Sequence, residues 1–589
     1  MSPVNAVVTW AGDEDAAVVE VSATGAAAEA VHAAVPELLI ARVASRLAAQ
    51  DPSVWGAELV DAVRDRLGWT DLHEASGDLV DRLTDLRREL RAEGLDRVVL
   101  AGMGGSSLAA EVITGSRGAP LTVLDSTAPA QVERALEGDL ARTVLVVASR
   151  SGTTVETDAH RRAFVAAFRA AGLEPARHVV VVTKPGSPLE ELARAEGYRA
   201  VFPADPRMSG RFSALSAYGL VPSALAGVDV RRVLDEAAEV APFFAEDSEA
   251  NPALVLATAL AATRPLRDTV LLADAGSGLY HFGDWAEQLL AESLGKGGRG
   301  LLPVVVDDDA PELATPGART LPVLLCPLVH DDAAAEVEEI ADATAPTDHV
   351  AVSGEFTGDT DTTSDERALA TEVTVAGSLG GMLLLWQHAV AIAGHLLGVN
   401  PFDQPDVEAT KAATREFLGG MPSLEPPAFE DSGVEVRAPR ALLRGVGTVA
   451  DAVATLLNRI DPDDGYLAVL AYLDREGRAP ELLRGVRDGL ARRTGRPVTF
   501  GWGPRYLHST GQLHKGGPPH GVFLMITGGP SPHVAVPGHD FDFAELVAAQ
   551  ADADARVLGG LGRPVLRLHV DTPDALAWLT GSLARRSTS

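Results

Sequence analysis

Two glycine- and hydroxyl-rich segments of the chain have the residue types that bind phosphate. The first is G-M-G-G-S-S at Gly102–Ser107, and the second is S-R-S-G-T-T-V-E-T at Ser149–Thr157. Each follows a short apolar, β-branched run and precedes a helix-like stretch. Glycine lets the backbone come close to a ligand, and hydroxyls with free amide hydrogens at a helix start suit an anion. The two segments therefore predict a pocket for a small phosphorylated molecule.

Three further segments carry side chains that suit acid–base chemistry. Gln288 and Glu292 are four residues apart in a helix-like stretch, so they share one helix face. Arg211 lies between a glycine and an aromatic residue in an apolar setting, where a guanidinium needs an acceptor. Lys411 lies two turns into a helix that Asp403 is suited to cap. The residues alone leave open a solvated carboxylate, a structural ion pair and a surface lysine.

A fourth segment, H-S-T-G-Q-L-H-K-G-G-P-P-H at His508–His520, is dense in histidine and glycine. Its histidine spacings do not match the helical pattern of a zinc protease, and no cysteine lies nearby. We therefore expect neither a metal nor an organic cofactor.

The elements that must position these residues alternate between strand and helix, which favours parallel sheets covered on both faces. We expect an α/β fold with an N-terminal helical segment (1–90), two doubly wound α/β domains (91–240 and 241–425) and a smaller C-terminal α/β domain (435–589). The expected strands are Arg97–Ala101, Leu121–Leu124, Thr143–Ala148, His178–Thr183, Tyr198–Val201, Thr269–Ala273, Leu301–Val306, Val323–Cys326, His349–Ser353, Tyr466–Leu470, Pro497–Gly501, Gly521–Ile526 and Val565–Val570.

Among the expected helices, Val31–Ala49 and Ala57–Leu67 lie in the N-terminal segment, Tyr280–Leu290 precedes Glu292, and a long apolar helix spans Gly377–Leu397. A polar stretch at Gly354–Asp365 is typical of an exposed loop, and P-S-L-E-P-P at Pro422–Pro427 of a linker.

The composition narrows the classes of function. The chain has 589 residues, of which 46% are hydrophobic, and this predicts a globular protein of several domains. The net charge of −32 argues against a nucleic-acid partner, because such proteins usually present a basic face. No apolar run approaches ~20 residues, so no membrane span is expected. Residues 1–13 lack a secretory pattern, and the single cysteine, Cys326, suits a reducing compartment; we expect a cytoplasmic protein.

Taken together and in order, the segments resemble glucose-6-phosphate isomerases of the tandem sugar-isomerase-domain (SIS) superfamily. Besides the two loops, the resemblance rests on G-R-F-S-A-L-S-A at Gly210–Ala217, E-Q-L-L-A-E-S-L-G-K at Glu287–Lys296, and the segment W-Q-H-A to E-A-T-K at Trp386–Lys411. The length and the C-terminal region resemble the isomerase half of bifunctional transaldolase–glucose-6-phosphate isomerases, which contain a similar S-T-G-Q-L-H-K-G-G-P. No barrel-length segment precedes it here, so transaldolase activity is not expected.

The resemblance implies reversible conversion of D-glucose 6-phosphate to D-fructose 6-phosphate through an enediolate, a step of glycolysis and gluconeogenesis. In this role Glu292 is the base, Arg211 stabilises the enediolate, Gln288 positions the substrate and Lys411 assists ring opening. The residues implied to hold the phosphate are Gly104, Gly105, Ser106, Ser149, Arg150, Ser151 and Thr154, with Arg150 standing where many members have lysine. Members are usually homodimers, so a homodimer is expected.

The ring-opening histidine departs from the family pattern. In ordinary members it follows the glutamate and precedes the lysine in a T-N-G-Q-H-type segment, and no such segment lies between Glu292 and Lys411. The preferred candidate is His514, in S-T-G-Q-L-H, with Lys515 as an accompanying phosphate or substrate contact. His388, on the long apolar helix, is the other candidate.

Three alternative functions stay open at this point. A dual phosphoglucose/phosphomannose isomerase would also accept mannose 6-phosphate. A non-catalytic sugar-phosphate sensor would need the hydroxyl loops but no base, so the presence of Glu292, Arg211 and Lys411 disfavours it. A scaffold role for the region after residue 430 is the third.

Overall fold

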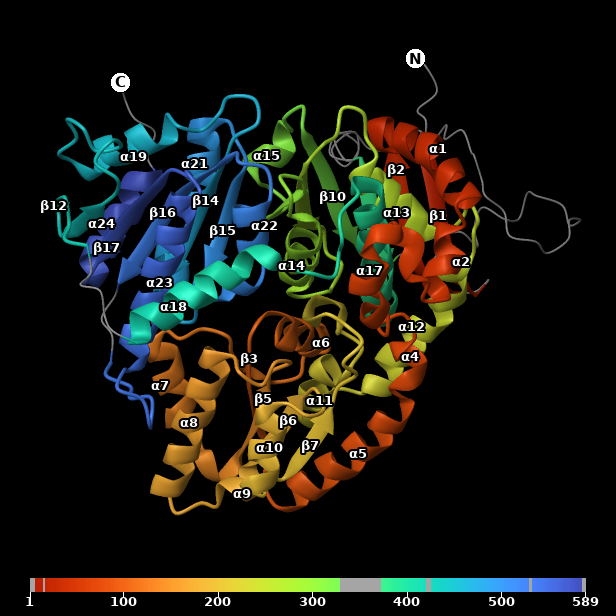
Figure 1. The fold of residues 1–589 in the computed structure, drawn as a ribbon, viewed down its shortest axis with the longest axis horizontal. Helices are drawn as coiled ribbons and strands as arrows, with labels where there is room; N and C mark the ends of the chain where they lie inside the picture. The colour runs from red at the N-terminus through yellow and green to blue at the C-terminus, as the bar shows by residue number, and fades with distance from the viewer. Residues whose placement is uncertain (1–5, 14–15, 329–371, 420–424, 529–531, 585–589) are drawn as a thin grey trace, which may run out of the picture.

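The structure is a computed structural model that describes residues 6–13, 16–328, 372–419, 425–528 and 532–584. Its strands form three sheets, two of six strands and one of five. Figure 1 shows the five-stranded sheet below, in orange and yellow, and the two six-stranded sheets side by side above it. We call them the first unit (around β3–β7), the second unit (around β8–β11) and the C-terminal unit (around β12–β17).

The first unit is built on a wholly parallel sheet in the order β4-β3-β5-β6-β7. Its strands are β3 (Arg97–Gly102), β4 (Thr122–Leu124), β5 (Thr143–Ala148), β6 (Val179–Thr183) and β7 (Ala200–Pro203). The helices between and after them are α6 (Leu108–Ser116), α7 (Pro129–Glu137), α8 (Val155–Ala170), α10 (Pro188–Ala195) and α11 (Ala217–Ala226). The three central strands, β3, β5 and β6, are valine-rich and buried along almost their whole length, as in a sheet covered on both faces.

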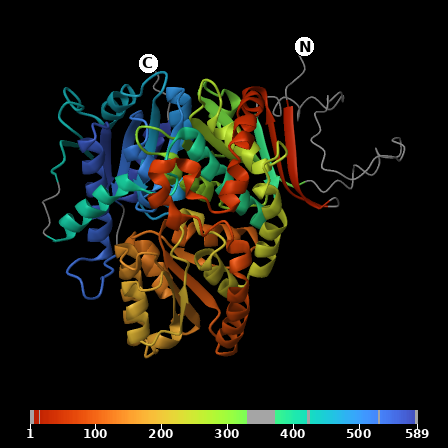
Figure 2. The ribbon, with the colours of Figure 1, turned by 45° about the vertical axis from the view of Figure 1, so that its right-hand side comes forward.

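The second unit has the strand order β1-β2-β11-β10-β8-β9. Four of its strands are parallel: β8 (Thr269–Asp274), β9 (Leu302–Val306), β10 (Thr320–Cys326) and β11 (Val373–Gly377). The other two, β1 (Ala6–Asp13) and β2 (Ala16–Thr24), form an antiparallel hairpin that joins the sheet through β11. Figure 2 shows this hairpin in red along one side of the unit.

The hairpin corrects the expectation of a wholly helical start. In β2, Val19, Val21 and Ala23 are fully buried, whereas Glu20 between the first two is exposed. This period of two is the pattern of a strand with one buried face, and the alanine-rich composition hid it. The helical expectation holds from residue 25 onwards, with α1 (Gly25–Ile40), α2 (Val43–Ala48) and α5 (Gly77–Ala92). The predicted helix at 57–67 is a series of short turns instead.

Helix α17 (Leu379–Leu397) forms the centre of the second unit, where it packs against α12 (Val230–Ala245), α13 (Pro252–Ala261) and α14 (Phe282–Leu294). Among the described residues, α17 alone is long and apolar enough to cross a membrane by length and composition. Because 89% of its apolar window is buried inside the protein, it is the core helix of a globular unit.

The C-terminal unit has the strand order β12-β13-β17-β16-β14-β15. Its parallel strands are β14 (Tyr466–Tyr472), β15 (Val498–Trp502), β16 (Gly521–Gly528) and β17 (Val565–Val570), which confirm the four predicted there. An unpredicted antiparallel pair, β12 (Phe429–Asp431) and β13 (Val434–Arg437), extends the sheet at β17. Its helices are α19 (Val449–Leu457), α20 (Ala479–Leu483), α21 (Val486–Thr494), α22 (Gly511–Gly516), α23 (Phe543–Gly560) and α24 (Pro573–Ala584).

Helix α18 (Glu408–Gly419) leads from the second unit to the C-terminal unit and packs against α23 (Figure 1). The predicted strand at 349–353, the predicted loop at 354–365 and residues 422–424 of the predicted linker lie outside the described residues.

Candidate active site

The two phosphate-type loops lie side by side at the carboxyl edge of the first sheet. They follow β3 and β5, whose last residues Gly102 and Ala148 are paired neighbours. In the second loop, Ser149 Oγ lies 2.9 Å from Thr154 Oγ1 and accepts a hydrogen bond from Gly152 N at 3.2 Å. Thr154 directly precedes α8, and the first amide groups of a helix lack helical partners and attract anions. Hydroxyls and amides thus converge as a phosphate group requires.

Arg150 supplies the cation of this loop. Its Nη2 donates to Pro206 O at 3.1 Å, and its Nε is buried with no partner among the described residues. Burial lowers the pKa of Arg150, and the positive charges of Arg66 and Arg211 act in the same direction. A guanidinium that lacks acceptors and lies near other cations is suited to an anionic ligand. Ser151, next to it, is exposed and accepts a hydrogen bond from the amide two residues on.

Gly104 and Gly105 let the first loop pack directly against the other units. Gly104 has a φ of +53°, and a Cβ there would lie 2.7 Å from His508 O and 2.8 Å from Gln288 Nε2. A Cβ at Gly105 would overlap the carbonyl oxygen of Gly210. Only glycine permits these approaches, so the loop is fixed within contact distance of three other segments. Ser106 is buried in the same turn.

Arg211, Gln288 and Glu292 form one contiguous buried cluster. Arg211 Nη1 lies 3.3 Å from Glu292 Oε1, and Gln288 Nε2 donates to Glu292 Oε2 at 3.0 Å. The same Gln288 Nε2 donates to His508 O at 2.8 Å. The Arg211 side chain is 1% exposed and that of Glu292 8%. The carboxylate of the second unit therefore faces Arg211 of the first unit.

Backbone carbonyls of the N-P-F-D-Q segment hold Arg211 in place. Its Nη2 donates to Pro401 O at 2.6 Å and to Asp403 O at 2.8 Å, while its Nε donates to Ser293 Oγ at 2.8 Å. Burial lowers the pKa of Arg211, and the carboxylate of Glu292 opposes this. The five donors of a guanidinium suit such a many-sided site, which a lysine would leave incomplete.

Lys296, at the end of the same helical segment, is a second buried cation beside Arg211. Its Nζ lies 2.7 Å from Asp403 Oδ1 and donates to Asn400 O at 2.8 Å. Burial first, and the charge of Arg211 second, lower the pKa of Lys296 to about 8. Lys296 was not among the predicted site residues, although the S-L-G-K ending of its motif contained it.

The structure does not bring Lys411 to this cluster. Lys411 lies on the partly exposed side of α18, and its Nζ pairs with Glu408 Oε1 at 2.7 Å. No hydrogen bond or ion pair joins it to Arg211 or Glu292 within the described ranges. Its proposed part in ring opening stays a prediction.

In the described residues, no hydrogen bond or ion pair joins either predicted ring-opening histidine to Glu292. His514 is buried in the C-terminal unit, where its Nδ1 lies 2.9 Å from Tyr466 OH and its ring packs edge-on against Phe523. Burial lowers the pKa of His514 to about 3, so its ring is neutral near pH 7. Lys515 is paired internally with Asp554 at 2.7 Å. His514 Nε2 is buried with no partner among the described residues. The roles predicted for His514 and Lys515 stay predictions.

The other candidate, His388, is enclosed in α17. Its Nδ1 lies 3.0 Å from Leu384 O, and its ring packs against Trp69 and Phe244. Burial lowers the pKa of His388 to about 4. It is a core histidine.

A different histidine, His508, reaches both loops. Its backbone oxygen contacts Gln288 as described, and its Nε2 lies 3.1 Å from Glu156 Oε1 at the start of α8. Gln550 Nε2, on α23, donates to the same Glu156 oxygen at 2.7 Å. Burial pushes the pKa of Glu156 upward, but the charge and hydrogen bond of His508 prevail and lower it. The His508 side chain is 19% exposed, so it is within reach of solvent and a ligand.

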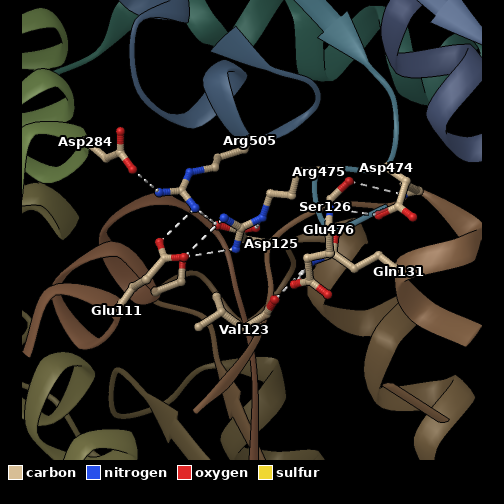
Figure 3. A network of polar contacts seen from close by, with 12 residues as sticks. Glu111, Val123, Asp125, Ser126, Gln131, Asp284, Asp474, Arg475, Glu476 and Arg505 are labelled. Carbon is tan, nitrogen blue, oxygen red and sulfur yellow. Dashed lines mark hydrogen bonds and ion pairs between the residues drawn. The ribbon is translucent and has the colours of Figure 1, made fainter. Parts of the chain in front are cut away.

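A buried ion network fixes the turn that carries His508 relative to the first and second units (Figure 3). Arg505, which opens this turn, lies 2.8 Å from both Glu111 of α6 and Asp125 after β4. It also approaches Asp284 of α14 at 3.4 Å. Burial favours the neutral form of Glu111, yet Arg505 and Arg475 hold its pKa at about 2. All three units therefore meet at the base of the His508 turn.

Several polar atoms around the two loops are buried and have no partner in the described part of the protein. They are Arg150 Nε, Thr157 Oγ1, Ser209 Oγ, Tyr218 OH and Gln288 Oε1. Such groups are few in folded proteins, and a bound phosphorylated polyol offers many oxygens and hydroxyls to satisfy them. In the described part of the chain, no group of three or more His, Cys, Asp or Glu is arranged to hold a metal ion.

Comparison with known proteins places the chain in a family. No family model matches it. A probable glucose-6-phosphate isomerase from Haloarcula marismortui is 33% identical over 356 residues, which cover 55% of this chain and 78% of that protein. The chain belongs to the glucose-6-phosphate isomerase family.

A second relative carries the same family name, and one solved structure is similar in fold. The glucose-6-phosphate isomerase of Citrifermentans bemidjiense is 32% identical over 355 residues, which cover 54% of this chain and 65% of that protein. The crystal structure of a hypothetical protein from Thermus thermophilus is 27% identical with a TM-score of 0.51, and the match covers 67% of this chain and 97% of the other.

For this glucose-6-phosphate isomerase family member, sequence reasoning missed His508 and Lys296. His508 is the first residue of its motif, but the T-G-Q context favoured His514 instead. The usable signal was the arginine three residues earlier: Arg505 is buried with acidic partners from both other units, and these fix the adjacent turn.

Proposed function

We propose that the chain interconverts D-glucose 6-phosphate and D-fructose 6-phosphate. The observation that carries the proposal is the position of Glu292, 3.3 Å from Arg211 and bonded through Gln288 to the segment that packs on Gly104. Aldose–ketose isomerisation needs one carboxylate with access to two adjacent carbons, plus a cation aimed at the enediolate oxygens. Membership of the family and the adjacent phosphate-type loops support the same reaction.

The proposed chemistry is a proton transfer between neighbouring carbons. Glu292 takes the proton from C2 of the open-chain aldose, and the electron pair left on C2 forms the C1–C2 double bond of the enediolate. The proton then returns to C1, the hydroxyl proton moves from O2 to O1, and C2 becomes the carbonyl. Arg211 leaves its ion pair with Glu292 to stabilise the enediolate oxygens, and Gln288 orients the base.

Ring opening needs a second proton-transfer group, and we assign it to His508. Its contact with Glu156 lies at the start of α8, directly after the phosphate-type loop. A histidine oriented by a carboxylate is a common general acid–base pair. In this assignment, a histidine of the C-terminal unit takes the place of the histidine that ordinary family members carry between the glutamate and the lysine.

The decisive experiment is the variant Glu292→Gln, assayed in both directions with glucose 6-phosphate and fructose 6-phosphate. Because a general base contributes about 10²–10⁴-fold, kcat should fall by that factor while fructose 6-phosphate still binds. Glu287→Gln, one residue earlier than Gln288 and on another helix face, is the matched control and should retain turnover. Near-normal turnover of Glu292→Gln would overturn the proposal. Ligand binding without any turnover in the native chain would favour a sugar-phosphate sensor, and mannose 6-phosphate tests acceptance of the second epimer.

The proposal also includes the oligomeric state and the cellular location of the protein. A homodimer, the usual state in this family, is tested by light scattering of the purified chain. A cytoplasmic location is supported by the single cysteine, Cys326, which has no second cysteine in the chain to pair with. Imaging of the tagged full chain in its own cell checks the location.

A further inference from the structure

A cavity of about 670 Å³ lies at the carboxyl edge of the parallel strands of the C-terminal unit, away from Glu292. Tyr472 ends β14, Thr527 lies at the end of β16 and His569 near the end of β17, and all three line it. Helix α23 forms one wall, and Pro129, at the start of α7 in the first unit, closes another side. Its size is that of a small-molecule site, and this edge is where open α/β sheets bind ligands.

The charges in the lining leave one cation without an ion pair among the described residues. The four carboxylates are all paired: Asp474 with Arg134, Asp552 with Arg567, Glu435 with Arg437, and Asp571 with His569. Arg478 also lines the cavity; it is exposed to solvent, and no ion pair joins it to any described residue. The rest of the lining is largely apolar, with leucine, valine and alanine side chains from α20, α23 and α24. The cavity of the described structure therefore combines a largely apolar lining with one solvent-exposed guanidinium that has no ion pair.

We propose that this cavity is a second ligand site, which binds a small molecule with an apolar body and one carboxylate, sulfonate or phosphate group on Arg478. The apolar body would lie against α23 and Leu576, and the anion would supply the partner that Arg478 lacks among the described residues.

The cavity is connected to the candidate active site through two sets of contacts. Helix α23 presents Val547 and Ala548 to the cavity, and from another face it presents Gln550, which bonds to Glu156 at 2.7 Å. Tyr472 OH, at the cavity, lies 2.9 Å from Tyr506 OH, and Tyr506 belongs to the same turn as His508. A ligand that shifts α23 or Tyr472 would thus move the groups that orient His508. This coupling rests on the proposed function, whereas binding does not.

Binding is tested with 1-anilinonaphthalene-8-sulfonate, an apolar anion whose fluorescence rises on burial. We expect saturable binding to the native chain, weakened about tenfold by Arg478→Glu, because a charge-assisted contact is replaced by repulsion. Arg484→Glu, an exposed arginine outside the cavity, should bind as the native chain does. Ala548→Trp should weaken binding by obstructing part of the cavity, and Ala577→Trp, exposed on α24, should not.

Circular dichroism confirms that each variant is folded. Unchanged dye binding in folded Ala548→Trp and Arg478→Glu would overturn the site. The coupling is tested by isomerase kinetics at saturating dye: kcat or KM of the native chain should change at least about twofold, since coupling energies are typically of that order or larger, and Arg478→Glu should respond only at higher dye concentration. Unchanged kcat and KM in the presence of bound dye would overturn the coupling but not the binding site. Absence of isomerase activity in the native chain would contradict the proposed function but would not affect the binding result.

Discussion

The two halves of the candidate site lie against each other but are built in different ways. The phosphate-type half comes from two short loops of one sheet, and its main contacts, such as Ser149 to Thr154, join residues a few positions apart. The acid–base half takes Arg211, Glu292 and His508 from three units, and buried ion pairs hold them together. The first half consists mainly of neutral hydroxyls and amides, whereas the second keeps opposite charges buried. We therefore expect damage to the first to change binding and damage to the second to change turnover.

After Glu292→Gln, the largest effect should follow Arg211→Lys, which keeps the charge but loses the planar set of donors. Removing one group that stabilises a developing oxyanion costs about 10²–10³-fold in kcat, and KM should change far less. Steady-state kinetics with fructose 6-phosphate measure both. Arg319→Lys, in an ion pair with Asp268 and Asp464, is the control. A rise in KM with normal kcat would break the distinction between the halves.

His508→Asn separates the assigned histidine from His514. We expect kcat to fall by about 10²-fold, the lower end for general acid–base catalysis, and the pH dependence of kcat/KM to change shape. His514→Asn should leave kcat within about threefold but lower the melting temperature, because a buried ring is replaced. The reverse pattern would restore the original assignment to His514 and contradict the role given to His508.

The sequence predicted that the two loops follow neighbouring strand ends because the signals for this are local. Glycines and hydroxyls directly after apolar runs identify strand ends, and parallel strands place their carboxyl ends on one edge. The same local logic identified Glu292 on the face of Gln288, and the structure shows that these two side chains are bonded. The parallel strands of the C-terminal unit were found for the same reason.

The remainder depended on distant contacts that no spacing reveals. His508 lies near the site because Arg505 pairs with Glu111 and Asp125, nearly four hundred positions away, as the separation of 380 residues to Asp125 shows. The hairpin β1–β2 was missed because alanine is a strong helix former, and only pairing with β11 makes that segment a strand. Lys411 was placed from family order, whereas the fold turns its ammonium toward Glu408.

The burial of charge in the acid–base half predicts an unusual dependence of stability on pH at Lys296. Its pKa is lowered to about 8 from 10.5, so between these values the unfolded chain binds the extra proton. Burial of the charged Lys296 lowers the free energy of unfolding. This loss of stability is fully present below pH 8 and is relieved as pH rises toward 10.5. From about pH 7.5 to about pH 10 the free energy of unfolding of the native chain should gain about 2 kcal/mol relative to Lys296→Met.

Urea denaturation of both proteins at the two pH values measures this difference. Lys411→Met is the control, since Lys411 is partly exposed and paired within its own helix. If the free energy of unfolding changed with pH in the same way for the native chain and for Lys296→Met, the pKa of Lys296 would not be lowered by burial. That result would also remove the contrast in buried charge between the two halves.

The smallest effect should come from the phosphate-type half, with Ser149→Ala or Thr154→Val. Each removes one hydroxyl from a group of several donors, so we expect KM to rise about tenfold, or roughly 1.4 kcal/mol, with kcat within about twofold. Uniform loss of binding is the signature of a group that contacts only the unreacting phosphate. Ser187→Ala is the matched control, because this buried hydroxyl caps α10 at the adjacent strand end. A fall in kcat comparable to that of Arg211→Lys would mean that the phosphate-type half also positions the reacting carbons. The two halves would then act together in catalysis.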